Sequence, residues 1–195
     1  MSLVQQVTAS SQNQDQANSL IVLIGLMGSG KTSVGRALAK KLGLKFFDSD
    51  ELIEKSLKLS VREIFAQKGE PEFRRLESIA LTEACSFAEP MVLAVAGGAV
   101  LQAENRTLLI SRAKFVVWLD APTSTLVGRT GRAKHRPLLD GDPVGALNQM
   151  RVDREDLYRQ IATHQIATQS LSVNQVVERV IDDCDLTARE LSIES

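Results

Sequence analysis

One motif constrains this chain more than any other feature. Residues 25–32 have the sequence Gly-Leu-Met-Gly-Ser-Gly-Lys-Thr and match the pattern G-x-x-x-x-G-K-[ST], whose backbone amides surround phosphate oxygens. The motif follows Leu20–Ile24, a continuously apolar run typical of a strand buried on both faces. It precedes Val34–Leu42, which has helical apolar spacing. The sequence therefore predicts a strand, a phosphate-binding turn and a helix, with ATP or GTP and Mg²⁺ as ligands.

The motif also assigns roles to its own side chains. Lys31 is expected to reach the β- and γ-phosphates, and the hydroxyl of Thr32 is expected to bind Mg²⁺. A chance glycine-rich turn is the alternative interpretation, and the position between a buried strand and a helix argues against it. The expected nucleotide-binding residues of this segment are Gly28, Ser29, Gly30, Lys31, Thr32 and Ser33.

Short apolar runs alternate with helical segments along the rest of the chain. Further strands are predicted at Lys45–Asp48, Met91–Val95, Phe115–Leu119 and Gln165–Thr168. Helices are predicted at Ser60 to about Gln67, Pro71 to about Phe87, Gln102–Ser111, Pro122 to near Gly131, Pro143–Ile161, and after Ser172. This alternation indicates a parallel sheet covered by helices on both faces, with ligands beyond the carboxyl ends of the strands.

Length and charge limit the domain organisation and the partners. A chain of 195 residues suits one domain, which we place at residues 19–195. Residues 1–18 are polar, lack the features of a signal peptide and are expected to form a disordered tail. A net charge of −1 provides no basic field for nucleic acid or a membrane surface, and no run approaches the ~20 apolar residues of a membrane helix. Two cysteines suit a reducing compartment, so a cytoplasmic protein is expected.

Three groups of charged residues follow the predicted strands. Asp48 and Asp50 either organise Mg²⁺ and a substrate hydroxyl, or Asp48 or Ser49 merely caps the next helix. Arg74 and Glu77 share a helix face, and by themselves they suit a surface ion pair. The segment from Arg129 to Pro137 is basic, which fits either a solvated turn or a lid that closes over phosphates.

Taken together, these pieces give the chain a family resemblance. From about Leu20 to Ile181 it resembles shikimate kinase through GLMGSGKT, FFDSD, IFAQKGEPEFRRLE, AGGAV, RPLL and LYR, in that order. The resemblance implies a P-loop, nucleoside-monophosphate-kinase-like fold of three α/β/α layers, with a five-stranded parallel sheet ordered 2-3-1-4-5. It implies transfer of the ATP γ-phosphoryl group to the 3-hydroxyl of shikimate, which gives shikimate 3-phosphate and ADP in chorismate biosynthesis.

The resemblance also implies residue roles. Those in catalysis fall to Lys31, Asp50 and Arg136, and those in Mg²⁺ binding to Thr32 and Asp48. Arg129 and Arg136 are expected beside the nucleotide, Arg136 within a lid at about 130–143. The residues implied for shikimate are Asp50, Arg74, Glu77, Gly97, Gly98 and Arg159, with Arg74 and Arg159 on the carboxylate.

Two departures from the family pattern accompany this resemblance. Ala96 stands where the family usually has the first of three glycines, and Thr168–Val173 lacks the arginine often found near the adenine. The alternatives are a non-catalytic protein on the same scaffold, or a kinase for gluconate or a nucleoside monophosphate. A monomer that binds shikimate and ATP is expected.

Overall fold

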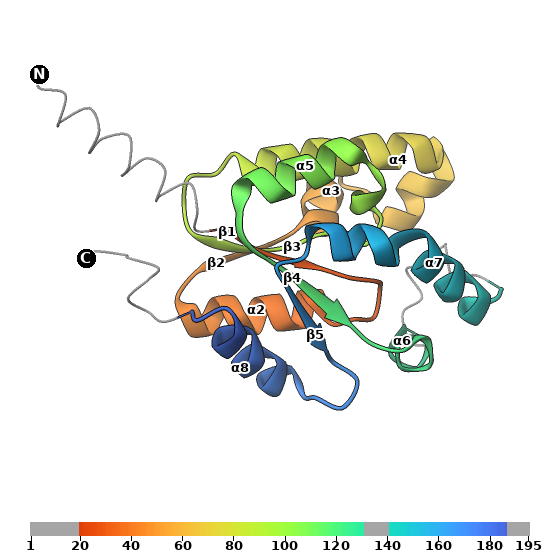
Figure 1. Ribbon diagram of the computed structural model, residues 1–195. Helices are drawn as coiled ribbons and strands as arrows, with labels where there is room; N and C mark the ends of the chain where they lie inside the picture. Colours follow the sequence, from red (N-terminus) through yellow and green to blue (C-terminus); the bar gives the residue numbers. More distant parts are fainter. Residues whose placement is uncertain (1–19, 131–140, 187–195) are drawn as a thin grey trace, which may run out of the picture.

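Five short strands form one parallel sheet in the order β2-β3-β1-β4-β5, which confirms the expected topology. This computed structural model describes residues 20–130 and 141–186 (Figure 1). The predicted tail and most of the predicted lid, including Arg136, lie outside the described residues. The strands are β1 Leu20–Ile24, β2 Lys45–Asp48, β3 Met91–Ala94, β4 Ala113–Asp120 and β5 His164–Ala167.

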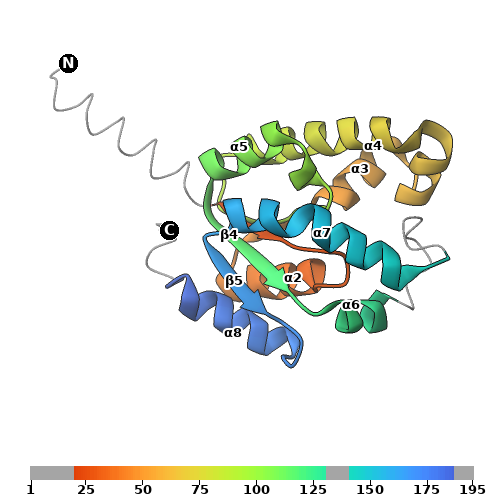
Figure 2. The ribbon, with the colours of Figure 1, turned by 45° about the vertical axis from the view of Figure 1, so that its right-hand side comes forward.

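Helices cover both faces of this sheet, as Figures 1 and 2 show. The elements are α2 Lys31–Leu42, α3 Ser49–Leu57, α4 Val61–Cys85, the 3₁₀ turn η1 Ala99–Leu101, α5 Ala103–Arg112, α6 Thr123–Thr130, α7 Pro143–Ile161 and α8 Val173–Asp183. Helices α2 and α8 pack on one face, and α4, α5 and α7 pack on the other. Within the described residues, no helix combines the length and apolar character needed to cross a bilayer.

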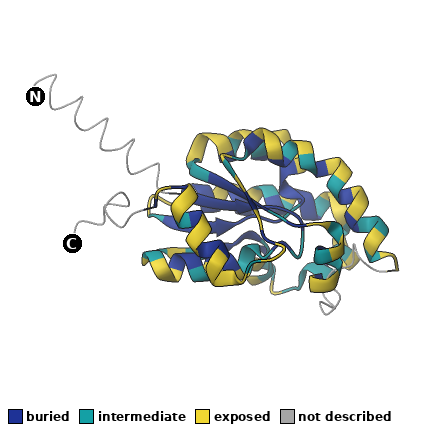
Figure 3. Cartoon of the chain, turned by 60° about the horizontal axis from the view of Figure 1, so that its bottom comes forward, coloured by how far each residue is buried: buried dark blue, intermediate teal, exposed yellow. Residues whose placement is uncertain are grey.

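The central strand β1 shows why its sequence is apolar at every position. Leu20, Val22 and Ile24 contribute to the core beneath α4, α5 and α7, while Ile21 and Leu23 contribute to the core beneath α2 and α8. All five side chains are buried, because successive residues of a strand point to opposite faces and both faces are covered. Figure 3 shows the strands buried between helices whose outer faces are exposed.

Helix α4 consists of two helical parts that meet at a kink, which agrees with the two helices expected in this region. Ser60 and Glu63 form the expected capping box at its start. The segment then continues through Gly69, whose φ of 77° and ψ of 171° interrupt the helical geometry, and Pro71 follows inside the second part. Because Pro71 lacks an amide hydrogen, the bend falls at the residues that precede it. The part of α4 after the kink carries Arg74 and Glu77.

The short helix α3 was absent from the expected elements. It begins directly after β2, where the Asp48 carboxylate accepts a hydrogen bond from the amide of Asp50 at 3.0 Å. Its buried residues are only Ser49 and Ile53, so its apolar pattern is too short to stand out in the sequence. The helix holds Asp50 just beyond the carboxyl end of the sheet.

Candidate active site

Two cavities lie beyond the carboxyl ends of the strands and meet at the phosphate-binding loop. The acceptor cleft, of about 210 Å³, is lined by residues of α3, α4, α7 and the segment after β3. The nucleotide groove, of about 550 Å³, is lined by the loop, α6 and the segment between β5 and α8. Lys31 and Thr32 line both cavities, so a group bound in one can reach a group bound in the other at these two side chains.

The backbone of the loop depends on its glycines. Gly28 has a φ of 82°, and a Cβ atom there would lie 2.8 Å from Cγ2 of Thr130 and 3.1 Å from the carbonyl oxygen of Leu126. A side chain is therefore excluded both by the left-handed backbone and by the close approach of α6. Gly30 caps α2 without a side-chain hydrogen bond, and the first turn of α2 contains no acidic residue. The amides at this helix terminus suit an anion.

Lys31 and Ser29 take different positions within the loop. The Lys31 ammonium donates hydrogen bonds to the carbonyl oxygens of Gly25, at 2.8 Å, and Leu26, at 3.1 Å. Ser29 is buried, its amide donates to the Leu26 carbonyl at 3.2 Å, and its hydroxyl has no hydrogen-bond partner among the described residues. The loop therefore offers phosphate groups a lysine and backbone amides, while the Ser29 hydroxyl is buried.

Of the two functions considered for Asp48, the structure shows the helix cap, and it also places the carboxylate against Thr32. One oxygen caps α3, and the other accepts a hydrogen bond from the Thr32 hydroxyl at 2.7 Å. The carboxylate is nearly buried at 9% exposure. Thr32 and Asp48 thus place two oxygen ligands together at the junction of the two cavities, and oxygen donors of this kind fit Mg²⁺. No cluster of three or more metal-ligating side chains occurs within the described ranges, so any metal there needs ligand or water oxygens as well.

The segment after β3 is fixed to the start of α3. The amide of Ala96 donates to the Ser49 hydroxyl at 2.8 Å, and both residues are buried. The methyl group of Ala96 is therefore accommodated where the family pattern has glycine. Gly97 and Gly98 follow and line the acceptor cleft together with Asp50.

Arg74 is held by two carboxylates at one wall of the cleft. Its guanidinium donates to Glu77 at 2.6 Å and to Glu70 at 2.7 and 3.1 Å. Burial alone would lower the pKa of Arg74, but Glu77 and Glu70 outweigh it and raise that pKa, so the group stays charged. Gly98 makes room for this arrangement, because a Cβ atom there would lie 2.0 Å from Nη1 of Arg74.

Glu77 lies between two arginines. It is only 2% exposed, and burial raises the pKa of its carboxyl, while Arg74 and Arg154 oppose that shift. Arg154 of α7 is also buried, at 6% exposure, and lines the cleft. Its Nε atom has no hydrogen-bond partner in the described part of the chain. Two buried guanidiniums thus face the cleft, with one buried carboxylate between them.

The structure corrects the expectation that Arg159 shares a substrate carboxylate with Arg74. The Arg159 side chain is 58% exposed and pairs with Asp156 at 2.6 Å and Glu155 at 2.8 Å. It does not line the acceptor cleft. Arg154 lines the cleft instead of Arg159, because Arg154 and Tyr158 are four residues apart and both lie on the buried face of α7. The next residue is turned by about 100° around the helix and leaves that face.

Sequence reasoning therefore missed Arg154, although a signal was available. The buried positions of α7 are Leu147, Met150, Arg154, Tyr158 and Ile161. A charged residue at the centre of an otherwise apolar helical stripe is the pattern that indicates a buried functional charge.

Arg129 lies in the nucleotide groove, as expected. Its guanidinium donates to the carbonyl oxygen of Thr168 at 2.7 Å, to the Thr168 hydroxyl at 3.0 Å and to the Gly28 carbonyl at 3.4 Å. It thereby ties α6 to the loop after β5. The far wall of the groove is formed by the apolar side chains of Leu171, Val173 and Val176. Ser33 also lines the groove and is exposed.

Comparison with known proteins gives a consistent result. Residues 27–185 match the shikimate kinase family model. The chain is 46% identical over 165 residues to a shikimate kinase of Symbiobacterium thermophilum, which is 83% of this chain and 94% of that protein. It is 41% identical over 162 residues to a shikimate kinase of Bordetella avium, which is 83% of this chain and 77% of that protein.

Solved structures agree with these sequence relatives. Shikimate kinase from Acinetobacter baumannii in complex with shikimate superposes with a TM-score of 0.82 and 38% identity, over 87% of this chain and 94% of that chain. The shikimate kinase of Aquifex aeolicus gives a TM-score of 0.73 and 31% identity, over 85% of this chain and 96% of that chain. A gluconokinase from Sinorhizobium meliloti, at 20% identity and a TM-score of 0.54, shares the fold alone.

Proposed function

The chain belongs to the shikimate kinase family, and from this premise we propose how its own residues phosphorylate shikimate with ATP. The observation that carries the proposal is the junction of the two cavities at Lys31 and Thr32. The γ-phosphoryl group of ATP bound in the groove would lie at this junction. The 3-hydroxyl of shikimate bound in the cleft would face it.

The acceptor carboxylate binds between the two buried arginines. Arg74 and Arg154 both line the cleft, and Glu77 balances their charge and steadies them. A carboxylate matches guanidinium donors in charge and geometry. Asp50 and the backbone of Gly97 and Gly98 then face the ring hydroxyls. This arrangement favours a small carboxylated polyol over an uncharged sugar.

The nucleotide binds with its phosphates on the loop and its base toward Arg129 and the apolar wall of the groove. Lys31 reaches the transferring phosphoryl group from its position under the loop. Arg136 is proposed as the arginine that approaches the phosphates from the segment outside the described residues. ATP, rather than GTP, is the proposed donor.

Thr32 and Asp48 would hold Mg²⁺, which supplies positive charge to the phosphates. The two oxygens are adjacent at the junction of the cavities, which fits this cation. We expect EDTA to abolish turnover and added Mg²⁺ to restore it. Asp48→Asn should raise the Mg²⁺ concentration needed for half-maximal rate by about tenfold, equivalent to about 1.4 kcal/mol.

The chemical step requires proton transfer and good positioning. The 3-hydroxyl oxygen forms a bond to the γ-phosphorus, and the bond from that phosphorus to the bridging oxygen of ADP breaks. The hydroxyl proton passes to Asp50, which also orients the hydroxyl before attack. Shikimate 3-phosphate and ADP are the products.

We further propose that the enzyme acts as a cytoplasmic monomer, without nucleic acid or membrane partners. The two cysteines, Cys85 and Cys184, are unpaired and buried, as suits a reducing compartment. The exposed large apolar side chains come one or two at a time from several elements. Light scattering should give a mass near 21.3 kDa, and a value twice as large would refute the monomer.

Shikimate and its neutral methyl ester provide the test of the acceptor site. We expect kcat/KM to fall by about 100-fold or more for the ester, since a hydrogen bond to a charged group contributes about 1.5–3 kcal/mol and two arginines lose their partner. Equal efficiency with both compounds would remove Arg74 and Arg154 from carboxylate binding.

A further inference from the structure

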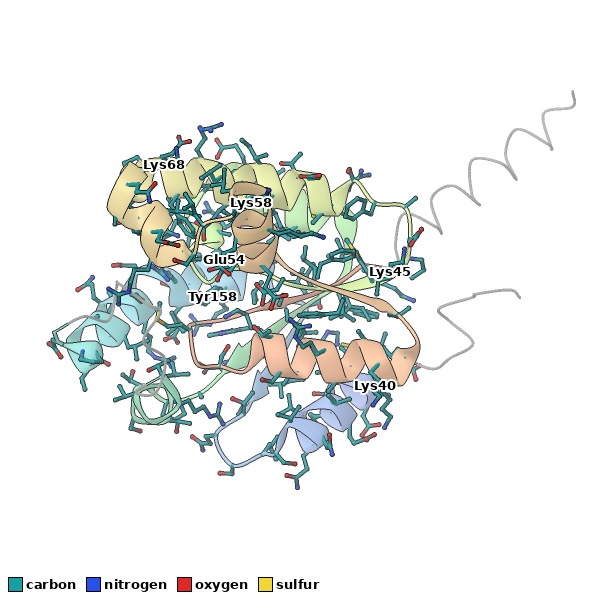
Figure 4. All side chains as sticks on the ribbon, turned by 180° about the vertical axis from the view of Figure 1, so that it is seen from behind. Lys40, Lys45, Glu54, Lys58, Lys68 and Tyr158 are labelled. Atoms are coloured by element: carbon teal, nitrogen blue, oxygen red, sulfur yellow. The ribbon has the colours of Figure 1, made fainter. Side chains whose placement is uncertain are left out.

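A buried phenol lies directly behind the acceptor cleft, and the roles proposed above do not use it. Tyr158 of α7 is 1% exposed, and its ring packs against Trp118 with ring centroids 5.7 Å apart. Its hydroxyl donates a hydrogen bond to the carbonyl oxygen of Gly97 at 2.7 Å. Figure 4 labels Tyr158 on α7, on the side of the sheet that α4 covers.

This hydrogen bond fixes a peptide plane that borders the cleft. In a trans peptide the carbonyl of Gly97 and the amide of Gly98 point in opposite directions. Tyr158 does not line the cleft, whereas Gly97 and Gly98 do, so the carbonyl points back toward the phenol. The Gly98 amide must then point forward into the cleft, and it makes no hydrogen bond within the described residues. It is available to a substrate oxygen.

The position of Gly97 leaves this peptide little freedom to move without the phenol. A Cβ atom on Gly97 would lie 2.9 Å from the carbonyl oxygen of Gly25 and 3.2 Å from the Tyr158 hydroxyl. The residue is thus packed between the phosphate-binding loop and the phenol. Glycine is the residue that allows this close approach.

The same phenol lies close to the second arginine of the cleft. Arg154 lies one helical turn before Tyr158 on the buried face of α7, and its positive charge acts on the phenol. Burial raises the pKa of Tyr158 far above its ordinary value, and Arg154 opposes that rise. The hydroxyl therefore keeps its proton and remains a donor to Gly97 at every physiological pH.

We propose that Tyr158 is a positioning residue for the acceptor, whose single hydroxyl, one helical turn from Arg154, aims the Gly98 amide into the cleft. The inference rests on the proposed function, since it assumes that Arg154 and Gly98 meet shikimate. A hydroxyl with only a structural role would support folding and leave the affinity for shikimate unchanged.

The variant Tyr158→Phe tests this, because it removes the hydroxyl and keeps the ring against Trp118. We expect the KM for shikimate to rise about tenfold, while kcat and the KM for ATP stay within about threefold. Thr163→Val is the matched control. It removes another hydroxyl, between α7 and β5, which bonds to the amide and carbonyl of Val116 away from both cavities. It should lower the melting temperature and leave both KM values unchanged.

Arg154→Ala, measured in parallel, distinguishes a failure of the proposed acceptor site from a failure of the positioning role of Tyr158. If Arg154→Ala raises the KM for shikimate and Tyr158→Phe leaves it within twofold, the positioning role is overturned and the proposed site stands. If Arg154→Ala has no effect on that KM, the proposed site fails and the inference fails with it. Should Tyr158→Phe be too unstable for kinetics, the rise in melting temperature caused by shikimate gives the same answer. The inference requires a smaller rise than in the wild type, and an equal rise overturns it.

Discussion

Replacing Arg154 and Arg159 in turn tests the structure against the expectation from sequence. Arg154 is 6% exposed, lines the acceptor cleft and lies beside Glu77. Its loss removes one charged hydrogen-bond donor from the substrate carboxylate, about 1.5–3 kcal/mol, and leaves Glu77 with one guanidinium fewer. Arg154→Ala should therefore raise the KM for shikimate by about 100-fold. Arg159 forms exposed ion pairs, about 0–1 kcal/mol each, and lies over the Trp118 ring at 5.9 Å, but it does not line the cleft, so Arg159→Ala should change that KM less than twofold.

The assay is ADP release at saturating ATP over a range of shikimate concentrations, with calorimetric titration of shikimate as a direct measure of binding. Arg154→Lys keeps the charge and loses the fork of donors, so its KM should fall between the wild type and Arg154→Ala. Thermal melting shows whether each variant is folded. A large effect of Arg159→Ala with none from Arg154→Ala would refute the reasoning from the face of α7.

Three further predictions concern the same cleft. Gly98→Ala places a Cβ atom 2.0 Å from Nη1 of Arg74 and should displace that guanidinium. The KM for shikimate should then rise by about 100-fold, with no change in the KM for ATP. An unchanged KM for shikimate would contradict the close contact between Gly98 and Arg74. Because burial raises the pKa of Glu77, the folded state binds its proton more tightly than the unfolded state, and stability falls as pH rises through the folded pKa. Denaturant unfolding should show that the free energy of unfolding of the wild type falls, relative to that of Glu77→Gln, as pH rises. A wild type that instead gains stability relative to Glu77→Gln as pH rises would contradict this sign. Asp50→Asn should retain ATP binding by calorimetry and lose at least about 100-fold in kcat, and near-normal turnover would exclude Asp50 as base or orienting group.

The fold was largely predictable because the central strands β1, β3 and β4 contain short apolar runs, each followed by turn residues or a polar residue. Leu20–Ile24 is buried on both faces, so every residue in it is apolar, and the same logic predicted the alternation of strands and helices along the chain. The strand order, which the sheet confirms, was implied by the family resemblance. Helix α3 was missed because nine residues with two buried side chains give no clear periodicity. The helix begins at the Asp48 cap, and an aspartate at the end of a strand is equally typical of a metal ligand.

The site residues were predictable where a motif fixes the local backbone. They were less predictable where the orientation of a helix determines which of its side chains face the cleft. Lys31 and Thr32 follow directly from the loop pattern, because a few glycines set the whole turn. On α7, both Arg154 and Arg159 lie near Tyr158 in sequence, and only the buried face distinguishes them. Proximity to a motif selects the exposed Arg159, whereas the i, i+4 spacing from Met150 selects the buried Arg154, which lines the cleft.

The most direct test of the central claim is ADP release by the full chain with ATP and Mg²⁺, with shikimate, gluconate or a nucleoside monophosphate supplied separately as acceptor. Two buried arginines facing a small cleft predict efficient turnover with shikimate, and a kcat/KM at least about 100-fold lower for the other acceptors. Comparable turnover with gluconate or a nucleotide, or none with shikimate in a folded protein that binds ATP, would contradict the account.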